Sequence, residues 1–181
     1  MQNMLANLRA RREDDERGFT LIELMVVVLI IAILIAIAIP TFLGAKSRAQ
    51  DKAAQSSLRN ALTNAKGIYT DADSYTGATP AALLAAEPSL TFVAAGSAST
   101  GAKVVSVNVV DATHIILVAK SASGSCYVMG DAANGPGTVF AKLASASTCS
   151  GTQANTDLGA ITTTPTAGTN TSTADAWVSA F

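Results

Sequence analysis

Leu24 to Ile39 read LMVVVLIIAILIAIAI, sixteen consecutive residues without one polar side chain. With its flanks from Phe19 to Leu43 the apolar stretch reaches about 25 residues, and a helix that crosses a bilayer needs roughly 20. The alternative is a buried core helix, but the rest of the chain has too few large apolar residues to surround one. We therefore expect a membrane-spanning helix over residues 19–43.

The chain as a whole is nearly neutral and has few residues of the types that carry catalysis or bind metals. The chain has 181 residues, with 49% hydrophobic and 14% charged residues, a net charge of -1, one histidine and two cysteines. This length excludes a large multidomain enzyme. The absence of a basic excess argues against nucleic acid as a primary partner. Because metal-ligating and catalytic residue types are scarce, we expect no metal site, no cofactor and no enzyme activity.

The segment before the apolar stretch is polar and charged. RARREDDER spans Arg9 to Arg17, and Gly18 follows. A secretory signal places its cleavage site after the apolar region, whereas here the small residue comes before it. Cleavage after Gly18 would remove a leader of residues 1–18 and keep the apolar helix. The alternative is that Gly18 is a turn residue between a tail and a permanent span.

Glu23 is an ionisable residue at the edge of this apolar stretch. A charge in hydrocarbon costs about 2 to 3 kcal/mol on insertion scales, so such a residue needs a partner. Cleavage after Gly18 would supply one, because the new α-amino group of Phe19 would be positive and only four residues away. In a packed array of helices, that amine can belong to the next chain. The alternative is a glutamate that extends to the interface.

These residues carry a family resemblance. Gly18-Phe19-Thr20-Leu21-Ile22-Glu23, the aliphatic run and Pro40 resemble the processing and assembly signature of type IV prepilins and the related pseudopilins. The resemblance implies an inner-membrane peptidase that cuts after Gly18 and methylates Phe19, an assembly role for Glu23 and a helix kink at Pro40. The acidic leader, with Glu13 to Glu16, departs from the family's usual short basic leader.

The resemblance also implies an architecture and partners. The implied fold is α+β: a long N-terminal helix, then a small antiparallel sheet. The implied partners are further copies in a helical filament, the prepilin peptidase, and indirectly an assembly platform protein and an ATPase.

Residues 44–72 predict an amphipathic continuation of the helix. One helical face is apolar, with polar residues such as Lys52 and Arg59 lying off it, so a single helix is expected from about Thr20 to Tyr69. The predicted apolar face comprises Ala54, Leu58, Ala61, Leu62, Ala65, Ile68 and Tyr69. A dimeric coiled coil is the alternative, but the seam is short and rich in alanine.

Residues 73–149 predict the sheet domain. A short helical turn is expected at Ala81 to Ala86, before the strands. Alternating and β-branched runs then predict five strands, of which the second and third form a hairpin whose turn lacks the usual glycine. The expected strands are Leu90–Ala94, Lys103–Val110, Thr113–Lys120, Ser125–Met129 and Thr138–Leu143.

Two cysteines follow the predicted span. An even pair in a domain beyond a membrane helix indicates a disulfide, here between Cys126 and Cys149, in an oxidising compartment outside the cytoplasm. Charge does not decide the orientation, because four arginines precede the span and four basic residues follow it closely.

Residues 150–181 are rich in serine and threonine. Their composition predicts either a solvated tail or an extended coat over the sheet, with a weak glycosylation triplet at Asn170. Trp177 and Phe181 predict that the terminus folds back onto the domain, and unstructured ends are the alternative.

The sequence therefore predicts a structural subunit of a type IV pilus, stored in the inner membrane as a single-pass precursor with its C-terminal domain outside, and extracellular after assembly. The alternatives are a pseudopilin of a type II secretion system and a monomeric membrane-anchored binding module.

Overall fold

The computed structural model describes residues 18–143 and 148–158. The described residues divide after Gly44 into two units, and each unit is described by itself. Residues 1–17 of the predicted leader, and the predictions at Asn170, Trp177 and Phe181, lie outside the described residues.

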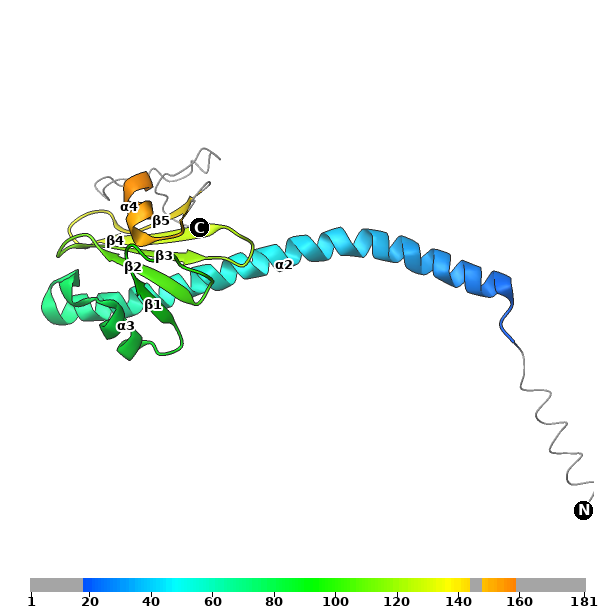
Figure 1. Cartoon of the computed structure of the whole chain (residues 1–181), viewed down its shortest axis with the longest axis horizontal. Coiled ribbons are helices and arrows are strands. Elements are labelled where there is room, and N and C mark those ends of the chain that lie inside the picture. The colour runs from blue at the N-terminus through cyan, green and yellow to red at the C-terminus, as the bar shows by residue number, and fades with distance from the viewer. Residues whose placement is uncertain (1–17, 144–147, 159–181) are drawn as a thin grey trace, which may run out of the picture. The chain divides into compact units, whose positions relative to one another are not determined.

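One long helix runs through both units. Helix α2 spans Leu21–Ala72, 52 residues, close to the predicted bounds (Figure 1). It ends where Asp73 adopts a left-handed backbone with φ of 51°, a conformation that aspartate tolerates better than most residues. In the first unit, the side chains of α2 are solvent-exposed up to Leu43.

In the second unit, α2 buries the predicted apolar face. The first five residues of that face are buried, and Ile68 and Tyr69 pack against them in part. Gln55 and Ser57 are buried as well, which the hydrophobic pattern did not indicate. The predicted amphipathic continuation is thus confirmed.

Two short helical segments follow. The 3₁₀ helix η1 spans Tyr75–Gly77, and helix α3 spans Pro80–Ala86. Helix α3 corresponds to the helical turn predicted at Ala81 to Ala86. Thr79 caps α3, because its Oγ1 accepts the backbone N–H of Ala82 at 3.2 Å.

The five predicted strands are present and form one sheet in the order β1-β2-β3-β4-β5. The strands are β1 Thr91–Ala94, β2 Val104–Val109, β3 His114–Lys120, β4 Cys126–Ala132 and β5 Gly137–Leu143. The α+β fold class is confirmed, with one difference: β1 pairs with β2 in parallel, while the other pairs are antiparallel. Residues 95–103 are long enough to return the chain to the same end of the sheet.

Strand β3 is apolar on both faces because both faces of the sheet are covered. Ile115 and Leu117 belong to the core shared with α2, whereas Ile116 and Val118 belong to a second core on the opposite face. That second face is covered by a helix, α4, Gly151–Leu158 (Figure 1).

The first part of the serine- and threonine-rich segment therefore differs from both predicted forms, solvated tail and extended coat. The hydrophobic pattern of the sequence does not predict α4, because its sequence GTQANTDL has little apolar content. Contacts from the sheet hold it: the N–H of Gly151 donates to Ser106 Oγ at 3.0 Å, and Asn108 donates to the Gly151 carbonyl at 3.2 Å.

The hairpin between β2 and β3 is confirmed, and its turn is longer than the two residues predicted. Val109 pairs with Ile115, and the chain turns between them. Asp111 organises this turn by accepting the N–H of Thr113 at 2.7 Å. A side-chain acceptor in a longer turn removes the need for glycine.

Candidate functional site

The candidate site lies at the start of α2, where Gly18, Phe19 and Thr20 precede the first helical residue. Thr20 is the N-cap: its Oγ1 accepts the backbone N–H of Glu23 at 3.2 Å, and Glu23 Oε2 accepts the backbone N–H of Thr20 at 2.9 Å. This reciprocal pair is a capping box, which satisfies two backbone donors that have no partner inside the helix. The same residues thus start the helix and fix the carboxylate.

One oxygen of the Glu23 carboxylate, Oε2, accepts the hydrogen bonds of the cap. Oε2 also accepts the hydroxyl of Thr20 at 2.8 Å, so both bonds fall on the same oxygen. Among the residues that the structure describes, Oε1 accepts no hydrogen bond, and the side chain is exposed. A second, charged donor can therefore approach Glu23 without breaking the cap.

Phe19 is 87% exposed beside this cap. In the uncut chain its nitrogen is a peptide nitrogen joined to Gly18 and carries no positive charge. The predicted cleavage after Gly18, the methylation of Phe19 and the pairing of its amine with Glu23 stay predictions.

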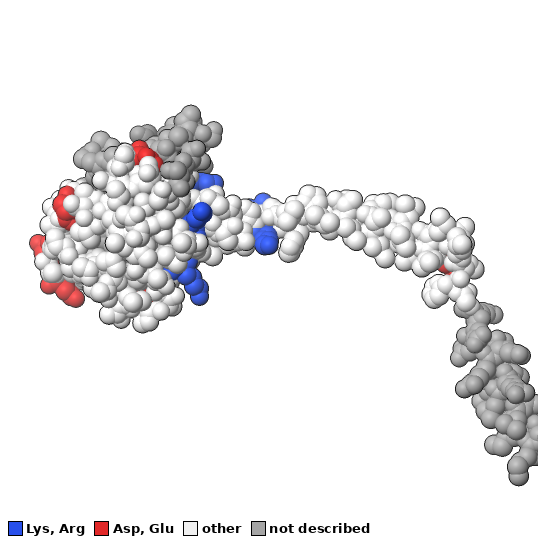
Figure 2. All heavy atoms as spheres, in the orientation of Figure 1, with Lys and Arg blue, Asp and Glu red and all other residues white. Residues whose placement is uncertain are grey.

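The helix beyond the cap presents apolar side chains around its whole circumference. The large apolar residues from Leu21 to Leu43 are exposed, and Figure 2 shows this part of α2 almost without charge. Within the described residues, α2 is the one helix whose length and composition suit a membrane span. Such a surface requires an apolar environment, either lipid or other helices.

Pro40 lies inside α2, which continues past it. Proline has no N–H, so the carbonyl of Ala36 loses its helical partner. One residue on, the hydroxyl of Thr41 donates to the carbonyl of Ile37 at 3.2 Å. The predicted kink stays a prediction.

Residues 14–39 match the family model of the prokaryotic N-terminal methylation motif. This match is the signature of type IV pilin and pseudopilin precursors, and it covers Gly18, Phe19 and Glu23. The chain carries a prepilin signature. Comparison with curated proteins and with solved structures gave no match.

The prepilin signature covers the exposed apolar helix and its cap, and ends just before Pro40. It implies processing by a prepilin peptidase and assembly into pili, and it points to a structural subunit. The signature and the apolar helix are consistent with anchoring in the inner membrane.

The two cysteines lie in the second unit, in the part of the chain that follows the prepilin signature. The structure joins Cys126, the first residue of β4, to Cys149, just before α4, with their Cα atoms 5.7 Å apart. The disulfide therefore fastens the start of α4 to the sheet. The one histidine of the chain, His114, bonds Asp111 through its Nδ1 at 2.9 Å.

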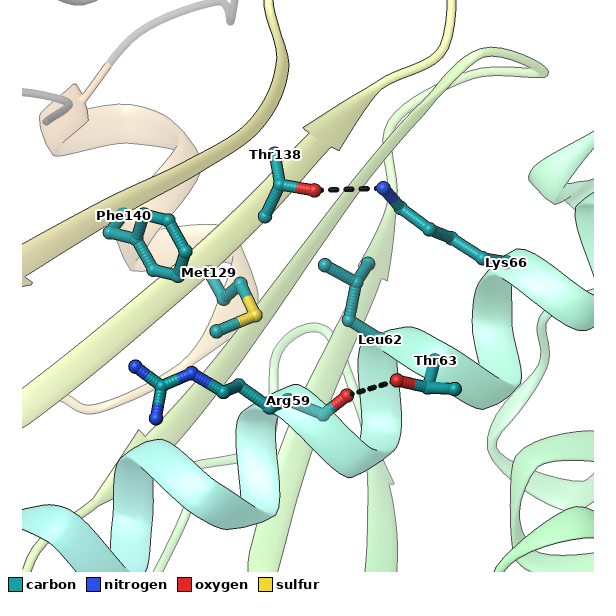
Figure 3. Close-up of a pocket in the computed structure, with 7 residues that line it drawn as sticks. All are labelled: Arg59, Leu62, Thr63, Lys66, Met129, Thr138 and Phe140. Carbon is teal, nitrogen blue, oxygen red and sulfur yellow. Dashed lines mark hydrogen bonds between the residues drawn. The ribbon is translucent and has the colours of Figure 1, made fainter. Parts of the chain in front are cut away.

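A polar cluster joins the helix to the sheet in the second unit. The buried carboxylate of Asp131 accepts the Lys66 ammonium at 2.8 Å, the Tyr75 hydroxyl at 2.6 Å and the Thr138 hydroxyl at 2.8 Å. Burial, together with the bond to Asp131, raises the pKa of Tyr75 well above its usual value. Figure 3 shows Lys66 reaching from α2 to Thr138 on β5, a contact of 2.8 Å.

Beside this cluster lies an open groove of about 370 Å³ between α2, β4 and β5 (Figure 3). Its lining mixes polar and apolar side chains, and polar groups of the lining bond one another: Lys66 bonds Thr138, and the Thr63 hydroxyl donates to the Arg59 carbonyl at 2.8 Å. Among the described residues no group of His, Cys, Asp and Glu could hold a metal ion.

Sequence reasoning missed two parts of these sites. The sequence analysis assigns no capping role to Thr20, although Thr-x-x-Glu before an apolar stretch is a recognisable capping-box pattern. The pairing of Lys66 with Asp131 joins residues 65 positions apart, so no local pattern indicates it.

Proposed function

We propose that the chain is the structural subunit of a type IV pilus, held in the inner membrane by residues 19–43 until it joins a helical filament. The observation that carries the proposal is the apolar surface of α2, exposed around its circumference and ending in one capped carboxylate. Transfer of this surface from lipid to a bundle of like helices keeps it in an apolar environment, so it costs little hydrophobic free energy.

Register in the filament then depends on charge. Cleavage after Gly18 creates a Phe19 ammonium, and Glu23 has an oxygen, Oε1, outside the cap. A helix in the wrong register would leave both charges unpaired in an apolar surrounding, which is strongly unfavourable. In this proposal the Phe19 amine of one subunit pairs with Glu23 of the next.

The disulfide supports a domain outside the cytoplasm, because disulfides persist in oxidising compartments. The peptidase would act first, and an assembly platform and its ATPase would then extract the subunit.

The test separates the charge of Glu23 from its cap. Glu23→Gln removes the charge but keeps an oxygen for Thr20, whereas Thr20→Val removes the cap partner and keeps the charge. We expect Glu23→Gln to reduce filament yield by about tenfold or more, since it leaves the ammonium unpaired, and Thr20→Val to reduce it far less. Filaments sheared from cells are quantified against the cellular amount of the chain.

The mass of the mature chain is the second measurement. An N-terminus at methylated Phe19 supports the proposal, and an N-terminus at Met1 supports a permanently anchored module. Normal filaments from Glu23→Gln would overturn the charge-register mechanism. Loss of protein secretion with no surface filament would instead identify a pseudopilin.

A further inference from the structure

The second unit has a basic end. Figure 2 shows Lys and Arg gathered at one end of this unit and most of the visible Asp and Glu at the opposite end. The basic end is defined by Lys46, Arg48, Lys52, Lys103, Lys120 and Lys142, all exposed.

Strand register brings the three sheet lysines to one end of the sheet. Lys120 lies opposite Cys126 and Lys142 lies opposite Tyr127, both where β4 begins. Lys103 immediately precedes β2, and β2 begins at this same end, because Val105 pairs with Ala119.

The helix supplies the other three cations at the same end. The hydroxyl of Ser123, in the connection between β3 and β4, donates to Asp51 Oδ1 at 2.5 Å. This contact places Lys52 and the preceding turn of α2 beside the connection. Partial burial opposes ionisation of Asp51, but hydrogen bonds from Ser123 and Ser121 outweigh it and lower its pKa.

The opposite end is acidic. Asp71 and Asp73 lie at the end of α2, and Asp111 lies in the turn between β2 and β3. The backbone N–H of Tyr75 donates to the carbonyl of Ala112 at 2.7 Å, which holds these two segments together.

The chain passes from the basic end directly into the apolar stretch. Along the chain, Lys46 follows Leu43 by three positions, Arg48 by five and Lys52 by nine. An anionic surface attracts cations within about a Debye length, roughly 8 to 10 Å, so cations that follow the apolar stretch this closely in the chain are suited to meet headgroups.

We propose that the basic end of the second unit binds anionic lipid headgroups at the bilayer surface and so seats the unit on the membrane before assembly. The inference rests on the membrane anchoring in the proposed function. Charge complementarity selects the occupant: headgroup phosphates attract the basic end, and the same surface repels the acidic end. Attraction and repulsion together turn the unit toward the membrane.

The reactivity of the lysine amines tests the contact between the basic end and the headgroups. The full chain is reconstituted in bilayers of phosphatidylcholine alone or mixed with phosphatidylglycerol, and the rate at which a neutral amine reagent acetylates each lysine is followed by mass spectrometry. Lys103, Lys120 and Lys142 are the informative sites, because they lie far from the span in sequence. We expect their rates to fall about threefold to fivefold in the anionic bilayer and to recover in high salt.

Lys66 is the internal control, because it lies outside the basic end and pairs with Asp131. Its rate should be the same in both bilayers. Equal rates for the sheet lysines in both bilayers would overturn the inference. So would protection that grows with protein density in pure phosphatidylcholine, which would indicate contact between copies. A chain that fails to enter either bilayer would count against the proposed function instead.

A charge variant provides a second readout. Lys103→Gln/Lys120→Gln/Lys142→Gln should lower the preference of spin-labelled phosphatidylglycerol for the protein, measured by electron paramagnetic resonance. The matched control, Asp71→Asn/Asp73→Asn/Asp111→Asn, removes as many charges from the acidic end and should not lower this preference. An unchanged preference in the lysine variant, with its thermal midpoint retained, would contradict a headgroup role for the sheet lysines.

Discussion

The carboxylate of Asp131 lies where α2, η1 and the sheet meet. Three donors from three different elements converge on it, Lys66, Tyr75 and Thr138. A buried charge is tolerated only when its hydrogen-bonding capacity is met, so this cluster fixes the helix relative to the sheet. The side chain of Lys66 is 45% exposed, so water screens its part of the interaction.

Replacing Asp131 tests this view. Asp131→Ala leaves the buried Tyr75 hydroxyl without its acceptor, and we expect it to lower the free energy of unfolding by about 2 to 4 kcal/mol. Tyr75→Phe keeps the ring and leaves Asp131 with two donors, so it should cost only about 1 kcal/mol. Urea unfolding of both variants measures the difference, and equal costs would show that the carboxylate is not the centre of the cluster.

A second residue, Asp111, makes the stability of the fold depend on pH. Hydrogen bonds from the His114 ring and then from the Thr113 backbone lower the pKa of Asp111 from 3.8 to about 2. A carboxylate with a lowered folded-state pKa stabilises the fold above its unfolded pKa, and that stabilisation is lost as pH falls from about 4 to 2. The residue is exposed, so the effect should stay below about 1 kcal/mol.

Comparison with Asp111→Asn isolates this contribution. The unaltered chain should be the more stable of the two at pH 6, and the difference should shrink as pH falls through that window. Urea midpoints at several pH values measure it. A difference that is constant from pH 6 to 2 would contradict the assignment.

At the scale of elements, the contact between α4 and β2 is unusually close. A Cβ built on Gly151 would meet the Cβ of Asn108 at 2.7 Å and its backbone nitrogen at 3.2 Å. Since the backbone nitrogen cannot turn aside as a side chain can, glycine is required where the helix begins.

Gly151→Ala should therefore push α4 off the sheet. We expect a loss of about 1 to 3 kcal/mol, typical of an overpacked contact. Gly101→Ala is the matched control, because nothing lies within 4 Å of its added methyl group. Thermal unfolding distinguishes the two, and a similar midpoint for both variants would mean that α4 accommodates the methyl group.

The elements that the sequence predicted are those with local periodicity. The 3.6-residue pattern from Ala54 to Tyr69 and the alternating strand patterns each record burial along one segment, so their types and approximate bounds follow from neighbouring residues. The parallel pairing of β1 and the position of α4 depend on contacts between distant segments. Asn108 and Ser106, which hold Gly151, carry no local signal of that role. Glu23, by contrast, can be recognised from local sequence alone, because a charge beside an apolar run is conspicuous without any tertiary information.

At the scale of the whole molecule, the two units differ in where their apolar side chains lie. Every buried residue in the described chain follows Ala45, beginning with Ala54, whereas the apolar side chains before residue 44 are exposed. The core of the second unit thus contains no side chain from the apolar stretch. If the chain exchanges lipid for neighbouring helices, as proposed above, it requires this independence, because a core shared with the anchor would have to open during the exchange.

A chain that begins at Ala45 should therefore be soluble and fold with the Cys126–Cys149 disulfide intact. It should elute as a compact species in gel filtration and unfold cooperatively in urea, because all residues of both cores are retained. A chain that begins at Arg59 is the matched control. It lacks Ala54 and Leu58, which are fully buried against the sheet, and should lose cooperative unfolding. If the longer chain aggregates while its disulfide is formed, the second unit depends on the anchor for its stability, and the subunit could not leave the membrane without unfolding.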